Sequence, residues 1–323
     1  MIKLFKQRGI AQWLILLVSC GLLWSKALYT TAVPMPNDGF APLYELLYNW
    51  LSPYPTAAMA VAWALIVAEG FLLAAMLNDY KLSPVRSLLP ALMYIVAMSY
   101  HASSLTLTPM LVVNLTVILM LRQLLLTGNV TLPTEKVFNA ALFVSLATLF
   151  YMPAATLLIP LLISLAVYKM YSWRDWIVTL LGIAAPYIVL VTYYFLTDQI
   201  DFMLYMFSND VAELEVHVAS KSVLHSVANA FFVLFLLVAT VATSSHFTER
   251  TIEIRKNATV VMLVALAAVA MLFFSRLFPV DTQLFAVPFA FAGTVFLLAS
   301  KRKLWFFDTL LTTLVVLGSI NEL

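Results

Sequence analysis

Long apolar segments recur from one end of this chain to the other, and they leave few folds open to it. A helix that crosses a bilayer needs about 20 mostly apolar residues. The 323-residue chain is 63% hydrophobic and 11% charged, whereas soluble domains are about 45–50% apolar and about 25% charged. This composition excludes an ordinary globular enzyme, a nucleic-acid-binding protein and a disordered chain. It predicts a multi-pass membrane protein.

The apolar segments predict an all-α, polytopic protein with about 11 transmembrane helices (10–12). They are 10–28, 56–77, 86–100, 105–126, 137–152, 154–171, 176–196, 223–243, 258–275, 279–299 and 304–320. The spans and their short connections use up the chain, so residues 1–323 are expected to form a single transmembrane domain. Pro153 lies between the fifth and sixth segments, and Pro160 lies within the sixth, which leaves open whether both segments cross the bilayer.

The basic residues predict the orientation, because cytoplasmic loops carry an excess of Lys and Arg. With a cytoplasmic N-terminus and alternating loops, 15 of the 18 basic residues fall inside, and only Lys26, Lys221 and Arg276 fall outside. A miscounted span would scramble this division. The C-terminus is therefore expected outside. The pattern fits a protein of the bacterial inner membrane.

The outer face carries the two longest connections, 29–55 and 197–222, and most of the acidic residues. In the first of them, Pro34 and Pro36 forbid a regular helix. Apolar residues then recur at helical spacing from Phe40 to Leu51, which predicts a short amphipathic helix in the membrane interface after the first span. Recognition or chemistry is therefore expected on this side.

Asp38 stands just before this helix and has two interpretations. As an Asp at a helix start it suits a capping role. It also suits a carboxylate fixed at the membrane surface beside an apolar slot, where it would act as a base or metal ligand. The two are compatible, because a capping carboxylate is also an oriented one.

Three further charged positions are unusual for a membrane protein. Glu69 lies near the middle of segment 56–77, where a carboxylate usually faces the bundle interior with a partner. The candidate partners are Asn114, Tyr94 and a tyrosine elsewhere in the chain. It is either a protonated side chain that joins two helices or part of a substrate or proton path. Lys26 and Arg276 are outer cations that either extend to lipid headgroups or bind phosphate near Asp281.

The chain resembles an uncharacterised family of Bacteroidota inner-membrane proteins. The resemblance rests on the run Tyr171–Gly182, on Ala185-Pro186-Tyr187, and on Lys301-Arg302-Lys303-Leu304-Trp305 before the last apolar segment. Members have carried the name beta-carotene monooxygenase, but the family implies no established activity. Carotenoid oxygenases hold iron with four histidines. The four histidines of this chain are expected on different sides of the membrane, so they cannot converge on one iron. A carotenoid oxygenase is therefore rejected, and no iron or haem is expected.

A looser resemblance is to the GT-C class of polyprenyl-phosphate-dependent glycosyltransferases. Asn37-Asp38 followed by Pro42-Leu43-Tyr44 is similar to the carboxylate and interfacial helix of their first external loop, and Arg276 ahead of Pro279 is similar to their late outer arginine. The chain departs from the class in having Asn37 in place of a second acid and in lacking a large periplasmic domain.

This second resemblance implies a glycosyltransferase that uses a lipid-phosphate-linked sugar at the outer face. Asp38 would be catalytic, and Arg276 and Lys26, or a divalent cation, would neutralise the leaving phosphate. Two alternatives stay open. One is a carrier or flippase for a lipid or small anion, with Glu69 and Arg276 lining its path. The other is a non-enzymatic scaffold of an envelope complex that binds partner membrane proteins through its Met- and Phe-rich faces.

Overall fold

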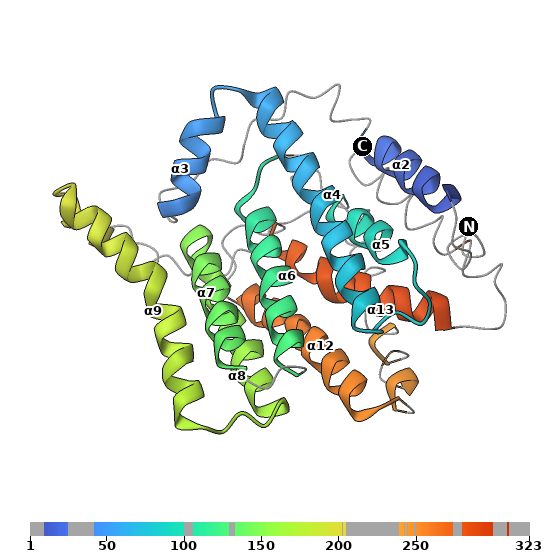
Figure 1. Ribbon diagram of the computed structural model, residues 1–323. Helices are drawn as coiled ribbons and strands as arrows, with labels where there is room; N and C mark the ends of the chain where they lie inside the picture. Colours follow the sequence, from blue (N-terminus) through green and yellow to red (C-terminus); the bar gives the residue numbers. More distant parts are fainter. Residues whose placement is uncertain are drawn as a thin grey trace.

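The computed structural model describes most of the chain, and every regular element in that part is a helix (Figure 1). The described residues are 10–24, 42–99, 106–128, 133–201, 203–204, 239–241, 243, 245–248, 250–273, 280–299 and 309. The predicted all-α class is confirmed for these residues. Segments 223–243 and 304–320 lie almost entirely outside them.

Four of the described helices are long and apolar enough to cross a membrane. They are α4 (Pro55–Asp79), α6 (Pro109–Thr127), α9 (Trp173–Leu196) and α12 (Ile252–Phe273). Proline occupies one of the first two positions of α4 and α6, where its missing N–H costs no helical hydrogen bond. The length and composition of these helices suit a membrane protein, as does the composition of the whole chain.

The remaining elements are shorter. They are α2 (Ile10–Trp24), α3 (Pro42–Leu51), α5 (Leu89–Met98), α7 (Thr134–Phe150), η3 (Met152–Leu157), α8 (Leu158–Val167), η4 (Val280–Phe285) and α13 (Ala286–Ala299). At about 1.5 Å per residue, the ten residues of α5 measure about 15 Å, half the thickness of a hydrocarbon core. Segments 154–171 and 279–299 each contain a 3-10 turn followed by an α-helix.

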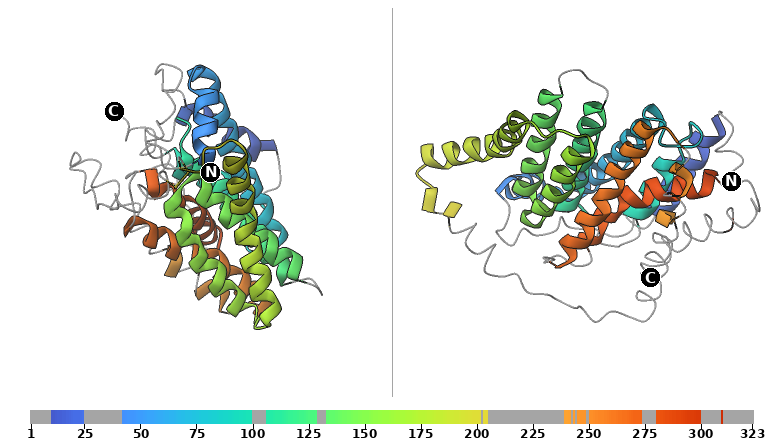
Figure 2. Two further views of the ribbon diagram at one scale, coloured as in Figure 1. Left: turned by 90° about the vertical axis from the view of Figure 1, so that its left-hand side faces the viewer. Right: turned by 90° about the horizontal axis from the view of Figure 1, so that it is seen from below.

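The shorter helices fill the space between the long ones. All ten residues of α5 are buried, and the helix packs between α4 and α13. Helix α6 is central: 67% of its most apolar stretch is buried inside the protein. In α9 only 17% of the corresponding stretch is buried. Figure 1 and the right-hand view of Figure 2 place α9 at the periphery of the bundle, where α7 is its main neighbour.

Helices α7 and α9 approach closely because a glycine faces an alanine. A Cβ atom on Gly182 would lie 2.6 Å from the Phe138 carbonyl oxygen and 2.8 Å from the Ala141 Cβ atom. Two hydrogen bonds cross the same contact: Ser145 Oγ donates to the Ile183 carbonyl, and the Thr148 and Tyr187 hydroxyls are 2.7 Å apart. Small residues with polar side chains between them are typical of helix pairs in membranes.

One end of the bundle collects most of the described basic residues, and we call it the basic end. Helices α4, α6 and α8 end there, and α7, α9 and α12 begin there (Figure 1). Its cations are Lys81, Arg86, Lys136, Lys169, Arg174, Arg250, Arg255 and Lys256. All of them belong to the set that the sequence assigns to the cytoplasm, so the structure gathers at one end what the loop alternation predicts on one side.

Helix α3 lies at the opposite end. Its Tyr44 hydroxyl donates to the Leu107 carbonyl at 2.9 Å, next to the start of α6. Leu43 packs against Leu149 near the end of α7 and Tyr194 near the end of α9. The short helix predicted after the first span is therefore confirmed, and it begins at Pro42.

Candidate functional site

The six residues singled out in the sequence are described to different extents. Asp38, Lys26 and Arg276 lie outside the described residues. Asp281 belongs to η4, but its side chain is not described. Tyr44 and Glu69 are both described, and both side chains are buried.

Glu69 is joined to α5 by a short hydrogen bond. The Tyr94 hydroxyl donates to Glu69 Oε2 at 2.6 Å, and both side chains are completely buried. Next to Glu69, a Cβ atom on Gly70 would lie 3.3 Å from the Ala91 carbonyl oxygen, so the glycine permits α4 and α5 to approach at this level. Tyr94, one of the candidates named from the sequence, is therefore the partner of Glu69.

The second candidate partner, Asn114, takes part in a neighbouring group of polar side chains. Its Nδ2 atom donates to the Gln283 carbonyl at 3.1 Å and lies 3.3 Å from Met98 Sδ. The Thr108 hydroxyl donates to Gln283 Oε1 at 3.2 Å. All of these side chains are buried, and they connect α5, the start of α6 and η4.

Tyr44 extends this group to α3. Its hydroxyl donates to the carbonyl of Leu107, the residue directly before Thr108. Burial, with a smaller contribution from Tyr48, raises the pKa of Tyr44 above its ordinary value, so the hydroxyl stays protonated and able to donate. Tyr44 is thereby held beside the segment that also holds η4, the element containing Asp281.

Together these side chains form a file of buried polar groups, which we call the polar file. It contains Glu69, Tyr94, Asn114, Gln283, Thr108 and Tyr44. Tyr94 and Met98 are one turn apart on α5, about 5–6 Å along the helix, and Met98 contacts Asn114. The file runs from the middle of α4 to the end of the bundle where α3 lies.

Several polar atoms of the file lack a partner among the described residues. They are Glu69 Oε1, Asn114 Oδ1 and Gln283 Nε2, with Ser99 Oγ nearby in sequence at the end of α5. Buried polar atoms are nearly always hydrogen-bonded. A run of unpartnered donors and acceptors therefore suits a place where water, a proton or a polar ligand is bound.

Sequence reasoning missed Gln283 and Thr108. Each lies among other polar residues at the edge of an apolar run, in Asp281-Thr282-Gln283 and in Thr106-Leu107-Thr108, so each offers only a weak signal. Their importance comes from a contact across 175 residues of chain. Among the described residues, no three His, Cys, Asp or Glu side chains are placed to hold a metal ion.

Comparison of the chain with protein-family models, with curated proteins and with solved structures gives no match. The site is therefore interpreted from its own geometry.

Proposed function

We propose that this protein is a multi-pass inner-membrane enzyme of GT-C type, which transfers a sugar from a lipid-linked phosphate at the end of the bundle opposite the basic end. The observation that carries the proposal is the junction of α3 and η4. Tyr44 donates to Leu107, and Gln283 accepts from Thr108, the next residue. Two elements that bear proposed site residues are thus held by one short segment of chain.

The proposed roles follow from the chemistry of the transfer. A carboxylate must lie within hydrogen-bond reach of the acceptor hydroxyl, and Asp38, four residues before α3, is assigned to this task. The leaving phosphate needs fixed positive charge. Arg276, Lys26 or a divalent cation would supply it, with Asp281 as a neighbouring ligand. Tyr44 fixes the helix that follows the catalytic loop.

The test is a comparison of lipid-linked sugars and glycans in cells that carry only a variant protein. Asp38→Ala is expected to abolish a product that the wild type makes. Asp201→Ala is the matched control, since Asp201 is an exposed acid of the other long external connection, and it is expected to leave the product unchanged. Identical profiles of lipid-linked sugars and glycans for wild type and Asp38→Ala would refute the proposed enzyme activity.

A carrier for a proton or small anion is the second candidate, and the unpartnered Glu69 Oε1 atom favours it. Ionisable residues inside membranes are rare, and they mark substrate or ion paths and proton relays. Glu69→Gln removes the titratable group at nearly constant shape. If the protein is a carrier, this variant is expected to stop pH-driven uptake in proteoliposomes. If the protein is the glycosyltransferase, the variant is expected to leave the lipid-linked product intact.

A further inference from the structure

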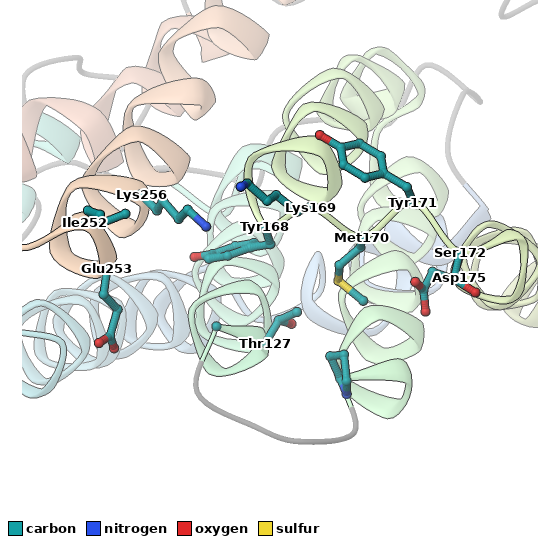
Figure 3. Close-up of a pocket in the computed structure, with 12 residues that line it drawn as sticks. Thr127, Tyr168, Lys169, Met170, Tyr171, Ser172, Asp175, Ile252, Glu253 and Lys256 are labelled. Atoms are coloured by element: carbon teal, nitrogen blue, oxygen red, sulfur yellow. The ribbon is translucent and has the colours of Figure 1, made fainter.

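The basic end contains a pocket that neither proposed function uses. Its volume is about 690 Å³, and it lies between the end of α6, the connection from α8 to α9 and the first turn of α12 (Figure 3). It is far from the polar file along α6, since it contacts Thr127 and Gly128 at one end of that helix while Thr108 precedes the other end. The pocket is therefore separate from the polar file.

Two lysines dominate one side of this pocket. The amino groups of Lys169 and Lys256 point toward one another beside the ring of Tyr168 (Figure 3). Neither forms an ion pair with any described residue, whereas Arg86 at the same end pairs with Asp79 at 3.0 Å and Lys136 with Glu135 at 2.9 Å. Like charges that face each other repel, so an anion between them would stabilise the arrangement.

The backbone fixes Lys169 at the rim of the pocket. Its φ angle is 61°, in the left-handed region that normally belongs to glycine after a helix. Lys169 N donates to the Ala166 carbonyl at 3.0 Å, and Met170 N donates to the Leu165 carbonyl at 2.9 Å. These bonds end α8 in a defined turn and hold the lysine where the chain leaves the helix.

Tyr168 forms the floor beneath the two amino groups and is itself fixed. Its hydroxyl donates to Asn257 Oδ1 at 2.8 Å, which ties α8 to α12. A Cβ atom on Gly128 would lie 3.1 Å from the Tyr168 ring, so the glycine leaves room for it. The ring therefore offers a rigid surface rather than a mobile side chain.

The acidic residues of the pocket stand apart from the lysine pair. Glu253 points away from it, and Asp175 lies on the opposite wall beside Ser172 (Figure 3). The first turns of α9 and α12 also border the pocket, and helix N-termini carry a partial positive charge. The electrostatic preference for an anion is thus confined to the side where the lysines converge.

We propose that this pocket binds a phosphate group between Lys169 and Lys256. Lysine ammonium groups suit phosphate as compact charges with three donors each. The pocket is much larger than one phosphate, so the remaining volume accommodates the rest of a phosphorylated molecule. The same chemistry is present in an anionic lipid headgroup and in a free phosphate compound, and the experiment has one arm for each source.

The experiment measures the Tm of the full-length protein. In the first arm, the protein in phosphatidylcholine nanodiscs is titrated with inorganic phosphate against chloride at equal ionic strength. In the second arm, nanodiscs of phosphatidylcholine alone are compared with nanodiscs that also contain phosphatidylglycerol. A ligand that binds only the folded state raises the Tm in a saturable way.

Three variants test whether the response depends on the two lysines. Lys169→Gln and Lys256→Gln are each expected to weaken the response about tenfold, the effect of losing one charged hydrogen bond. The matched control is Lys81→Gln. Lys81 lies at the same end, has a φ angle of 57° and follows a tyrosine at the end of α4 as Lys169 does at the end of α8, but it borders a different pocket.

Each outcome decides the proposal. A lysine-dependent response in the first arm supports a free phosphate ligand, and one in the second arm alone supports a lipid headgroup. The proposal is overturned if neither arm shows a response in the wild type, or if Lys169→Gln and Lys256→Gln both leave that response unchanged. It is equally overturned if Lys81→Gln reduces the response as much as Lys169→Gln, because the effect would then be the general charge of the basic end.

Discussion

The hydroxyl of Tyr94 lies 2.6 Å from Glu69 Oε2, and this single hydrogen bond joins α4 to α5 where both side chains are fully buried. Loss of this hydrogen bond would leave the carboxyl group without any partner among the described residues, because Oε1 already lacks one. The cost of leaving a buried polar group unpaired exceeds the net gain from forming a typical hydrogen bond. The pair is therefore a sensitive point of the fold, whatever substrate the protein handles.

Removing the donor should destabilise the protein more than neutralising the acceptor. Tyr94→Phe leaves both Glu69 oxygens unpaired, so we expect the free energy of unfolding to fall by about 1–3 kcal/mol. Glu69→Gln keeps an amide oxygen that accepts from Tyr94, and we expect a loss below about 1 kcal/mol. Denaturant unfolding of the purified protein in one detergent measures both.

The control is Tyr54→Phe, because Tyr54 is exposed and precedes the same helix α4. It should change the free energy of unfolding by no more than about 0.5 kcal/mol. Equal effects of Tyr94→Phe and Tyr54→Phe would contradict a structural role for the Glu69–Tyr94 hydrogen bond.

The contact of α7 with α9 should not tolerate a methyl group at position 182. In Gly182→Ala the new Cβ atom would meet the backbone oxygen of Phe138 at 2.6 Å, and backbone cannot move aside as a flexible side chain can. Overpacking of this kind costs about 1–3 kcal/mol. We expect a lower Tm and easier proteolysis near Asp198, where the chain leaves α9.

Gly21→Ala is the matched control, since no atom lies within 4 Å of a Cβ atom at that position of α2. Alanine favours a helix over glycine by about 1 kcal/mol, so this variant should be neutral or slightly more stable. A Gly182→Ala protein as stable as Gly21→Ala would show that α7 and α9 are further apart than described.

Lys169→Gly should not destabilise the protein, although it removes a charge and adds a glycine. The left-handed conformation at φ 61° costs a non-glycine residue about 1–2 kcal/mol, and the greater entropy of unfolded glycine offsets part of the relief. We expect a net change between zero and a gain of about 1 kcal/mol. Arg174→Gly, inside the first turn of α9, should lose about 1 kcal/mol. A large loss in Lys169→Gly would contradict the left-handed turn.

A helix could be predicted from the sequence where the local residue pattern determines it. Those parts of the site that depend on contacts between distant residues could not be predicted. Apolar periodicity from Phe40 to Leu51 predicted α3, and the burial of Tyr44 confirms its inward face. Glu69 stood out because a carboxylate in an apolar run is rare, and tyrosine was a natural partner. By contrast, the bond from Asn114 to Gln283 spans 169 residues, and no pattern within either segment encodes it.

The lengths of the short helices also depend on contacts that the local sequence pattern does not show. Hydropathy measures how far an apolar run extends, so residues 86–100 looked like a short span. Only the packing of α5 between α4 and α13 shows a ten-residue helix buried on every side. The gathering of the described basic residues at one end of the bundle was easier to predict, because charge alternation depends on the order of segments and not on their exact ends.

The final prediction concerns alkaline pH. Burial, with smaller contributions from Tyr80 and Glu253, raises the pKa of Tyr168 above its ordinary value of about 10. Below pH 10 the phenol is protonated in both folded and unfolded chains. Above pH 10 only the unfolded chain releases the proton readily, so the unfolded state binds fewer protons and stability falls as the pH rises.

Tyr168→Phe removes both this pH dependence and the 2.8 Å hydrogen bond to Asn257. At pH 8 the variant should be less stable than the wild type by about 1 kcal/mol, and the difference should shrink between pH 10 and pH 11.5. Tyr171→Phe, whose ring is mostly exposed, corrects for the titration of the lysines, which all three proteins share. A wild type and a Tyr168→Phe variant that lose stability in parallel above pH 10 would contradict the burial of this phenol, and with it the rigid floor of the phosphate pocket.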